Sequence, residues 1–156
     1  MEKIAIQIWK NSNIDKENFK KFLIDEVPHS LKDHISSYQV NLADEDVKDA
    51  AGLIQSCYPP SPNAIVFLKV KSLFHFEQRL SIFESYAKKF FSYIISESKI
   101  IEADDSKNLH RRTDGFSQIV FLEKPKNIET FDWFDHWTHH HTEIAIETQS
   151  NFIYTQ

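Results

Sequence analysis

The chain contains few of the residues on which several common protein classes depend. Cys57 is its one cysteine, so no disulfide can form within the chain. It has two glycines, Gly52 and Gly115, and therefore no glycine-rich loop that could hold the phosphates of a nucleotide. We expect no nucleotide cofactor, and nothing in the sequence indicates another cofactor.

Long apolar segments and basic segments are also missing. No apolar run approaches the roughly 20 residues that a membrane helix needs, and the first ten residues, MEKIAIQIWK, contain no apolar signal core. The net charge is −5, and no run of adjacent Lys or Arg residues is longer than a pair such as Lys20–Lys21. Nucleic acids and anionic membrane surfaces require a basic face. We therefore expect a cytoplasmic protein with no nucleic-acid or membrane partner.

The composition is that of a folded protein with many aromatic side chains. Hydrophobic residues make up 41% and charged residues 26% of the 156 residues, which are globular values. The 13 phenylalanines supply large apolar surfaces for a core or an interface. The chain is long enough to bury a substantial core.

Periodic patterns in the first two thirds of the chain predict one sheet with helices on one face. Residues 3–10 alternate, with Ile4, Ile6 and Ile8 on one side, as in a half-buried strand. Asp15 can cap a helix that Pro28 ends or kinks. The further predicted elements are strands at 35–42, 64–70 and 90–95, a short helical piece at 47–54, and a helix opened by Ser72 with Phe76, Leu80, Phe83 and Ala87 on one stripe. This order predicts a ferredoxin-like βαββαβ unit over residues 1–105, in the α+β class.

The same pattern begins again in the last third of the chain. Residues 116–125 are predicted as a strand, Asn127–Gln149 as a helix and 150–155 as a further strand, with a loop over 96–114. We expect 113–156 to form a partial second β-α-β unit, packed with the first as one globular body. A full second repeat would continue past Gln156, so the chain is a fragment, a shortened version, or one that a second chain completes.

The helix predicted over Asn127–Gln149 contains the candidate site. At about 100° per residue, its apolar side holds Trp133, Phe134, Trp137, Ile144 and Ala145, and its polar side holds Asp132, Asp135, His139, Thr142 and Glu143. His141 falls among the apolar residues, one turn beyond Trp137. An imidazole in an apolar site is neutral and can accept a proton or donate a hydrogen bond. We take His141 as the candidate catalytic acid–base residue, and Phe134, Trp137 and His140 as candidate substrate-binding residues.

Two other interpretations of these histidines remain. His141 can be a core histidine bonded to a carbonyl or a carboxylate, and Glu97 and Glu147 are candidate partners for its ring. His136 and His140 are one turn apart, with Glu143 and Glu147 on the same side, which allows a two-histidine, one-carboxylate metal site. The metalloprotease helix needs a glutamate directly after its first histidine, and that position holds Trp137. We therefore predict no metal site.

The last third of the chain resembles the EthD-like family, which is named after a gene cluster for ethyl tert-butyl ether degradation. The matching features are Trp137 and His141 four residues apart, then Thr142, and IETQS at Ile146–Ser150. Residues 44–53 and 93–98 resemble the first half of longer, two-repeat members, relative to which this chain looks C-terminally shortened. The resemblance implies a dimeric α+β barrel, hence a homodimer, with a cavity for a small molecule.

Three functions are compatible with this resemblance and these residues. The first is a cofactor-independent catabolic or polyketide-type enzyme, an oxidoreductase or a lyase or dehydratase, that binds an apolar or aromatic organic molecule and uses His141 as acid–base. The second is a non-catalytic carrier or accessory protein with the same cavity. The third is a dimerisation module without a ligand.

Overall fold

The structure, a computed structural model, has an α+β fold and describes residues 1–74, 76–102, 111–150 and 153–156. The chain divides into two compact units, which we call the N-terminal unit (Met1–Ser96) and the C-terminal unit (Glu97–Gln156). The sequence suggested a division between residues 105 and 113, whereas the structure divides at Ser96. Within the described ranges, no helix has the length and apolar character to cross a membrane.

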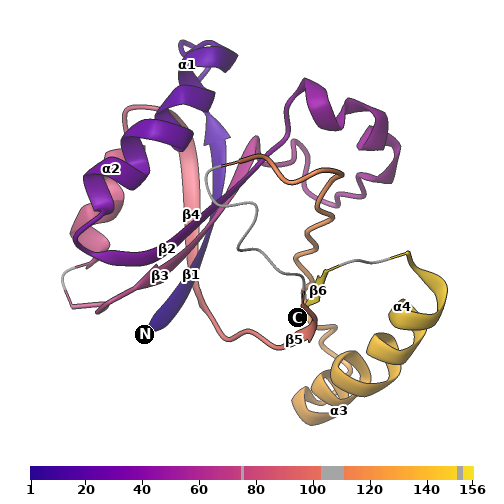
Figure 1. The fold of residues 1–156 in the computed structure, drawn as a ribbon. Coiled ribbons are helices and arrows are strands. Elements are labelled where there is room, and N and C mark those ends of the chain that lie inside the picture. Colours follow the sequence, from indigo (N-terminus) through magenta and orange to yellow (C-terminus); the bar gives the residue numbers. More distant parts are fainter. Residues whose placement is uncertain (75, 103–110, 151–152) are drawn as a thin grey trace. The chain divides into compact units, whose positions relative to one another are not determined.

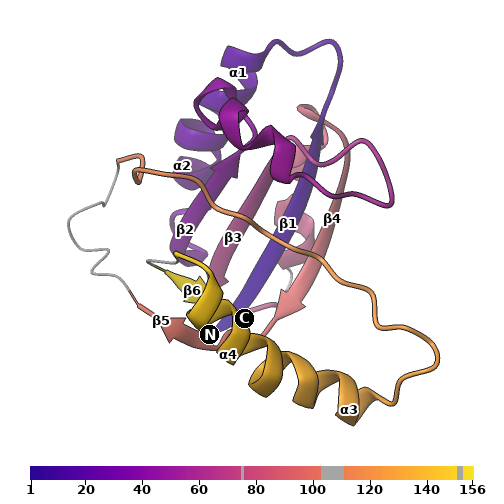
Figure 2. The ribbon, with the colours of Figure 1, turned by 90° about the vertical axis from the view of Figure 1, so that its right-hand side faces the viewer.

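A four-stranded antiparallel sheet forms the centre of the N-terminal unit (Figure 1). Its strands are β1 (Glu2–Lys10), β2 (Ile35–Leu42), β3 (Ala64–Val70) and β4 (Ala87–Ile95). They lie in the order β2-β3-β1-β4, and Figure 2 shows the four strands side by side. All four strands were predicted from the sequence, and β4 begins three residues earlier than expected. The α+β prediction is confirmed.

One face of this sheet forms the main core. Ile6 is fully buried and pairs with Val66 in the neighbouring strand, and both point to the helical side. The alternating residues of β1 and β3 that share this side are Ile4, Ile8, Leu68 and Val70, and all are buried. Period-two alternation in the sequence therefore identified the buried face of each central strand correctly.

The opposite face of the sheet carries aromatic and lysine side chains. The ring centroids of Trp9 and Phe91 are 5.6 Å apart, edge to face. The Lys89 ammonium lies 4.3 Å from the centre of the Trp9 ring, and that of Lys3 lies 5.1 Å from the Phe67 ring. These cation–π contacts cover the rings with charged groups, which explains how large aromatic residues occur on a partly exposed face.

The helical run that covers the core face is continuous through a proline. It consists of α1 (Lys16–Lys21), the π-helical turn η1 (Phe22–Glu26) and α2 (Val27–Leu31). The Asp15 side chain accepts a hydrogen bond from the Asn18 amide, as predicted for its cap. Pro28 was expected to end or kink the helix, but the helix continues to Leu31. The wide turn directly before Pro28 supplies the room that its ring and missing N–H require.

The two remaining connections of the N-terminal unit are 3₁₀ helices. The first, η2 (Glu45–Leu53), lies where the sequence predicts a short helical piece. The second, η3 (Phe76–Phe83), replaces the longer helix that was predicted from Ser72 onward. Phe76 and Phe83 are buried at its two ends, as their stripe predicted. A 3₁₀ helix rises further per residue than an α-helix. Eight residues therefore span the distance between Phe76 and Phe83.

The C-terminal unit contains a short two-stranded sheet and one helical run. Its elements are β5 (Lys99–Ile101), α3 (Thr130–Asp135), η5 (His136–His141), α4 (Thr142–Thr148) and β6 (Tyr154–Thr155). The antiparallel partners are β5 and β6. The sequence predicted a loop where β5 lies. Of the strand predicted over 150–155, the structure shows β6, and residues 151–152 lie outside the described residues.

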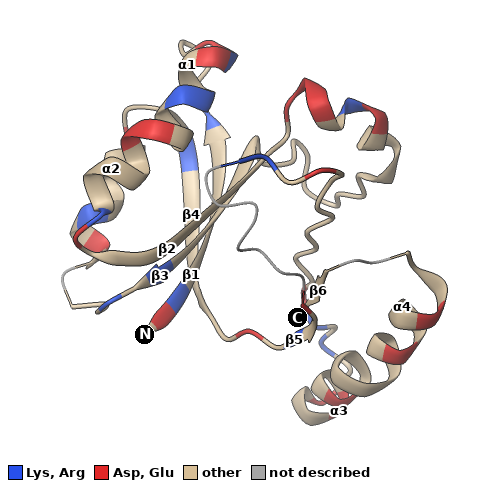
Figure 3. Cartoon of the chain, in the orientation of Figure 1, with Lys and Arg blue, Asp and Glu red and all other residues tan. Residues whose placement is uncertain are grey.

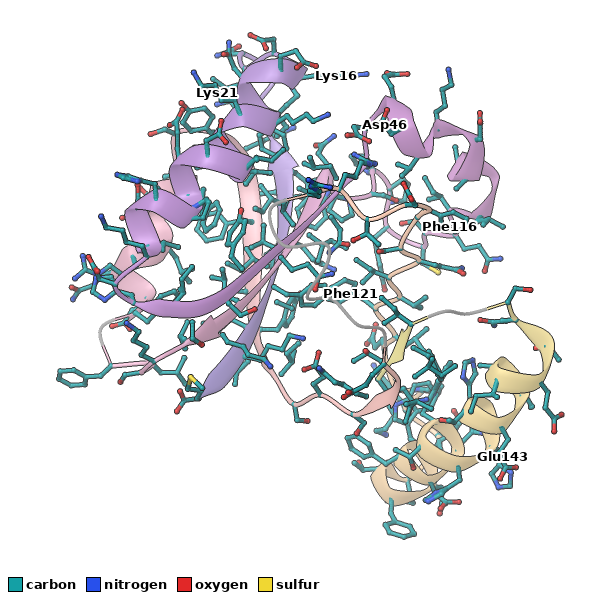
Figure 4. The ribbon with its side chains drawn as sticks, viewed as in Figure 1. Lys16, Lys21, Asp46, Phe116, Phe121 and Glu143 are labelled. Carbon is teal, nitrogen blue, oxygen red and sulfur yellow. The ribbon has the colours of Figure 1, made fainter. Side chains whose placement is uncertain are left out.

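The strand predicted over residues 116–125 was wrong, because the segment has no regular secondary structure. Phe116 and Phe121, which Figure 4 labels, are 50% and 44% exposed. An alternating apolar segment becomes a strand only where a neighbouring strand accepts its hydrogen bonds. The sheet of this unit is formed by β5 and β6 without it. The expected second repeat therefore lacks its first strand.

Candidate functional site

The helical run that contains the candidate site has a wide π-helical turn at its centre. η5 contains His136–His141, between α3 and α4. The buried side of the run consists of Trp133, Trp137, His141 and Ala145, spaced by four, together with Thr142. Strict α-helical spacing had placed Phe134 and Ile144 inward and Thr142 outward, and this was wrong. Phe134 and Ile144 are 61% and 57% exposed and Thr142 is 8% exposed, since the wide turn rotates the faces of the helix.

The structure brings His141 and Trp137 together as the sequence predicts. Their ring centroids lie 4.1 Å apart with planes inclined by 37°, and both side chains are partly buried. Trp133 extends the aromatic row, with its ring centroid 5.5 Å from that of Trp137. A flat indole therefore lies against one side of the imidazole and fixes its orientation.

The hydrogen-bond partner of His141 is the hydroxyl of Tyr154. The distance from Nδ1 to this hydroxyl is 3.3 Å. Glu97 and Glu147 were the candidates from the sequence, and the ring bonds instead to a neutral group on β6. Tyr154 in turn accepts a hydrogen bond from the Gln156 amide at 2.8 Å. The direction of the bond between Nδ1 and this hydroxyl depends on the tautomer of His141, and in either tautomer Nε2 lies outside the pair.

Gln156 joins this pair to the wide helical turn. Its amide nitrogen also lies 2.7 Å from the Trp137 carbonyl and 2.7 Å from the Thr142 hydroxyl. The Thr142 hydroxyl donates to the same Trp137 carbonyl at 3.1 Å. The Gln156 amide has two hydrogens, which the Trp137 carbonyl and the hydroxyls of Thr142 and Tyr154 share.

Sequence reasoning missed the contribution of Tyr154, Gln156 and Thr142. Tyr154 and Gln156 are two residues apart at the end of an extended segment, so both side chains point to the same side of it. That spacing was the available signal. Thr142 gave no signal because its inward position depends on the wide turn, which the sequence does not reveal.

The other two candidate substrate-binding residues have exposed side chains, whereas that of His141 is partly buried. Phe134 is exposed, and His140 is exposed with its ring next to that of His136, at a centroid distance of 6.1 Å. Among the described residues, no group of three His, Cys, Asp or Glu side chains is placed to hold a metal ion. Glu143 is exposed on α4 (Figure 4). Figure 3 shows acidic residues and no Lys or Arg on α3 and α4.

One polar atom beside His141 has no partner. Within the part of the chain that the structure describes, the buried indole Nε1 of Trp137 makes no hydrogen bond. A buried donor without an acceptor costs free energy, by about 1–3 kcal/mol. The indole N–H is thus an unpaired donor on a ring that lies against the imidazole of His141.

A separate cleft lies in the N-terminal unit, beside η3 and the β1–β4 edge of the sheet. Its volume is about 370 Å³. Six of its eight lining residues are apolar or aromatic, and Glu77 and Ser92 are the polar ones. The full lining is Ile4, Leu73, Phe76, Glu77, Leu80, Ser92, Tyr93 and Ile94. This volume is in the range of small-molecule sites, about 300–1,000 Å³.

The chain matches no protein-family model and no curated protein. The resemblance to the EthD-like family therefore depends on the residues quoted from the sequence, and family membership stays a prediction. The fold class, the cleft and the neighbours of His141 are independent of that resemblance.

Proposed function

We propose that the protein binds a small apolar or aromatic organic molecule in the cleft beside η3. The cleft itself carries this proposal, because it is large enough for a single-ring compound and its walls are mainly apolar. The β1–β4 edge of the sheet supplies Ile4 and Ile94, and η3 supplies Leu80. Transfer of a ligand's apolar surface from water to such walls is worth about 25 cal/mol per Å².

A charge placed in the cleft tests where binding occurs. Ile94 is 68% exposed and lines the cleft, so Ile94→Glu adds a carboxylate there without disturbing the core. Ile54 is 60% exposed after η2 and outside the cleft lining, so Ile54→Glu is the matched control. With toluene and ethylbenzene as probes in ligand-observed NMR, we expect saturable binding that Ile94→Glu weakens and Ile54→Glu leaves unchanged. No saturable binding to the unmodified protein would refute the proposal.

We further propose that His141 acts as an acid–base group, with Trp137 beside it. The hydrogen bond between Nδ1 and Tyr154 supports this role, because it holds the ring through one nitrogen and leaves Nε2 outside that pair, to exchange a proton with a ligand. The test uses compounds that the first experiment identifies as ligands. An enzyme will form product from one of them and lose turnover in His141→Gln, while His139→Gln, on the exposed side of the same turn, retains it. Binding without product would favour the carrier function instead.

We also propose EthD-like membership and a homodimer. The motif residues Trp137, His141 and Ile146–Ser150 support membership. The aromatic face of the sheet, with Phe91 49% and Tyr93 45% exposed, supports self-association. Sedimentation velocity at several concentrations should give the mass of a dimer, and the monomer mass of 18.4 kDa at all of them would exclude it.

A further inference from the structure

A second, smaller pocket in the N-terminal unit has three basic residues among its six described lining residues. Its volume is about 110 Å³, too small for the organic ligand proposed above. His34, Lys71 and Arg79 line it together with the hydroxyl of Ser72. The other described residues of its lining are Phe74 and Phe76, and none of the six is a carboxylate. In a chain of net charge −5, this is an unusual concentration of basic side chains.

The sheet register and η3 bring these residues together from three places in the sequence. Ile35 and Val70 form the last pair of the β2–β3 ladder, and the next residue outward on each side is His34 and Lys71. The Lys71 amide donates to the His34 carbonyl at 3.0 Å, which extends the ladder by one more bond. Phe76, buried at 3% exposure, anchors the start of η3 and so fixes the position of Arg79 one turn later.

The hydrogen bonds of the pocket leave donors available. The Lys71 ammonium donates to the Asp33 carbonyl at 3.0 Å, which orients it and leaves two of its three hydrogens. The Ser72 hydroxyl oxygen accepts from the Phe74 amide at 3.1 Å, so its own hydrogen can point to a ligand. Among the described residues, the Arg79 guanidinium forms no ion pair or hydrogen bond.

We propose that this basic pocket binds a small oxyanion of the phosphate class. Phosphate oxygens are strong acceptors, and a guanidinium, an ammonium and a hydroxyl supply charge-assisted bonds to several of them at once. A volume of about 110 Å³ suits a single phosphate group better than a larger organic anion. The phosphate is either the free ion or the head of an ester whose remainder extends into solvent.

Phosphate titration at constant ionic strength tests this site. We expect inorganic phosphate, exchanged against chloride, to shift the backbone amide resonances of Ser72 and Phe74 in a saturable way. Arg79→Gln should weaken the binding about tenfold, the loss expected for a charge-assisted contact. The matched control is Lys48→Gln, which removes a positive charge from an exposed position on η2 outside the pocket and should not change the affinity.

The outcomes separate the proposal from nonspecific screening. A linear response without saturation, an equal response to chloride, or an equal loss in Lys48→Gln and Arg79→Gln would overturn it. Phenyl phosphate distinguishes the two sources: tighter binding than inorganic phosphate identifies an ester, and weaker binding identifies the free ion. Arg79 is exposed, so the fold of the variant is preserved, and an unchanged far-UV CD spectrum checks this.

Discussion

At the scale of single residues, Tyr38 shows how one buried hydroxyl links the sheet to the helix above it. Its hydroxyl donates to the Leu23 carbonyl at 2.5 Å, inside the wide turn η1. The Val27 amide bonds to the Phe22 carbonyl, and Pro28, five residues beyond Leu23, has no N–H to donate to the Leu23 carbonyl. We expect Tyr38→Phe to lower the free energy of unfolding by about 1–2 kcal/mol at pH 7, because it leaves a partly buried carbonyl without a donor. Urea denaturation followed by fluorescence measures this.

The same tyrosine makes stability sensitive to alkaline pH. Desolvation by burial raises the pKa of Tyr38 above its ordinary value of 10.0. The unfolded chain therefore loses this proton at lower pH than the folded protein, and the stability that Tyr38 contributes falls as the pH rises above about 10. Between pH 8 and 11 the urea midpoint should decrease less in Tyr38→Phe than in the unmodified protein. Parallel curves for the two proteins would show that other groups cause the decrease.

Asp15 gives the corresponding acid-side prediction. The hydrogen bond from the Asn18 amide lowers the pKa of its carboxyl below the ordinary value of 3.8. The stability contributed by the ionised cap is therefore present above that value and lost as the pH falls below it. Asp15→Asn retains a capping side chain and removes the titration. Thermal denaturation between pH 2.5 and 6 should show a shallower acid-side decrease in the variant, and an unchanged slope would contradict the role of this cap.

At the scale of elements, neighbouring residues of η1 offer a matched comparison. Leu23 is fully buried, and Ile24, the next residue, is 44% exposed. Leu23→Ala should lower the free energy of unfolding by about 2–5 kcal/mol, because it leaves a cavity under the helix. Ile24→Ala removes an aliphatic side chain of the same size from the outer side of the helix. It should lower the free energy of unfolding by no more than about 1 kcal/mol. Equal losses in urea denaturation would mean that η1 does not present the faces described above.

The two helical runs also show which part of the site could be predicted from the sequence. Alternation and apolar spacing placed the core faces of β1 and β3 and the contact of Trp137 with His141, because these depend on local periodicity. The wide turns η1 and η5 could not be predicted, because they depend on which groups satisfy the displaced carbonyls. In η5 these groups are Thr142 and Gln156, and Gln156 is distant in the sequence.

At the scale of the whole molecule, the repeated sequence pattern predicted the structure of the last third of the chain poorly. The segment 116–125 resembles β1 in sequence, yet β1 is a strand because β3 and β4 pair with both of its edges. Strand formation is thus a property of the partners as much as of the segment. A comparison of two short apolar segments contains no information about those partners, and this is why the expected second unit does not appear as predicted.

The distribution of buried residues leads to a prediction about the two units. The entire main core cluster lies between Ile4 and Ala87, in the N-terminal unit. In the described part of the C-terminal unit, only Thr142 and Ala145 are buried. Because apolar burial is the main favourable term in folding, residues 1–96 expressed alone should fold and residues 97–156 alone should not. Far-UV CD and urea denaturation of both fragments measure this. A cooperative transition in the 97–156 fragment, or none in the 1–96 fragment, would show that the core described above does not determine folding.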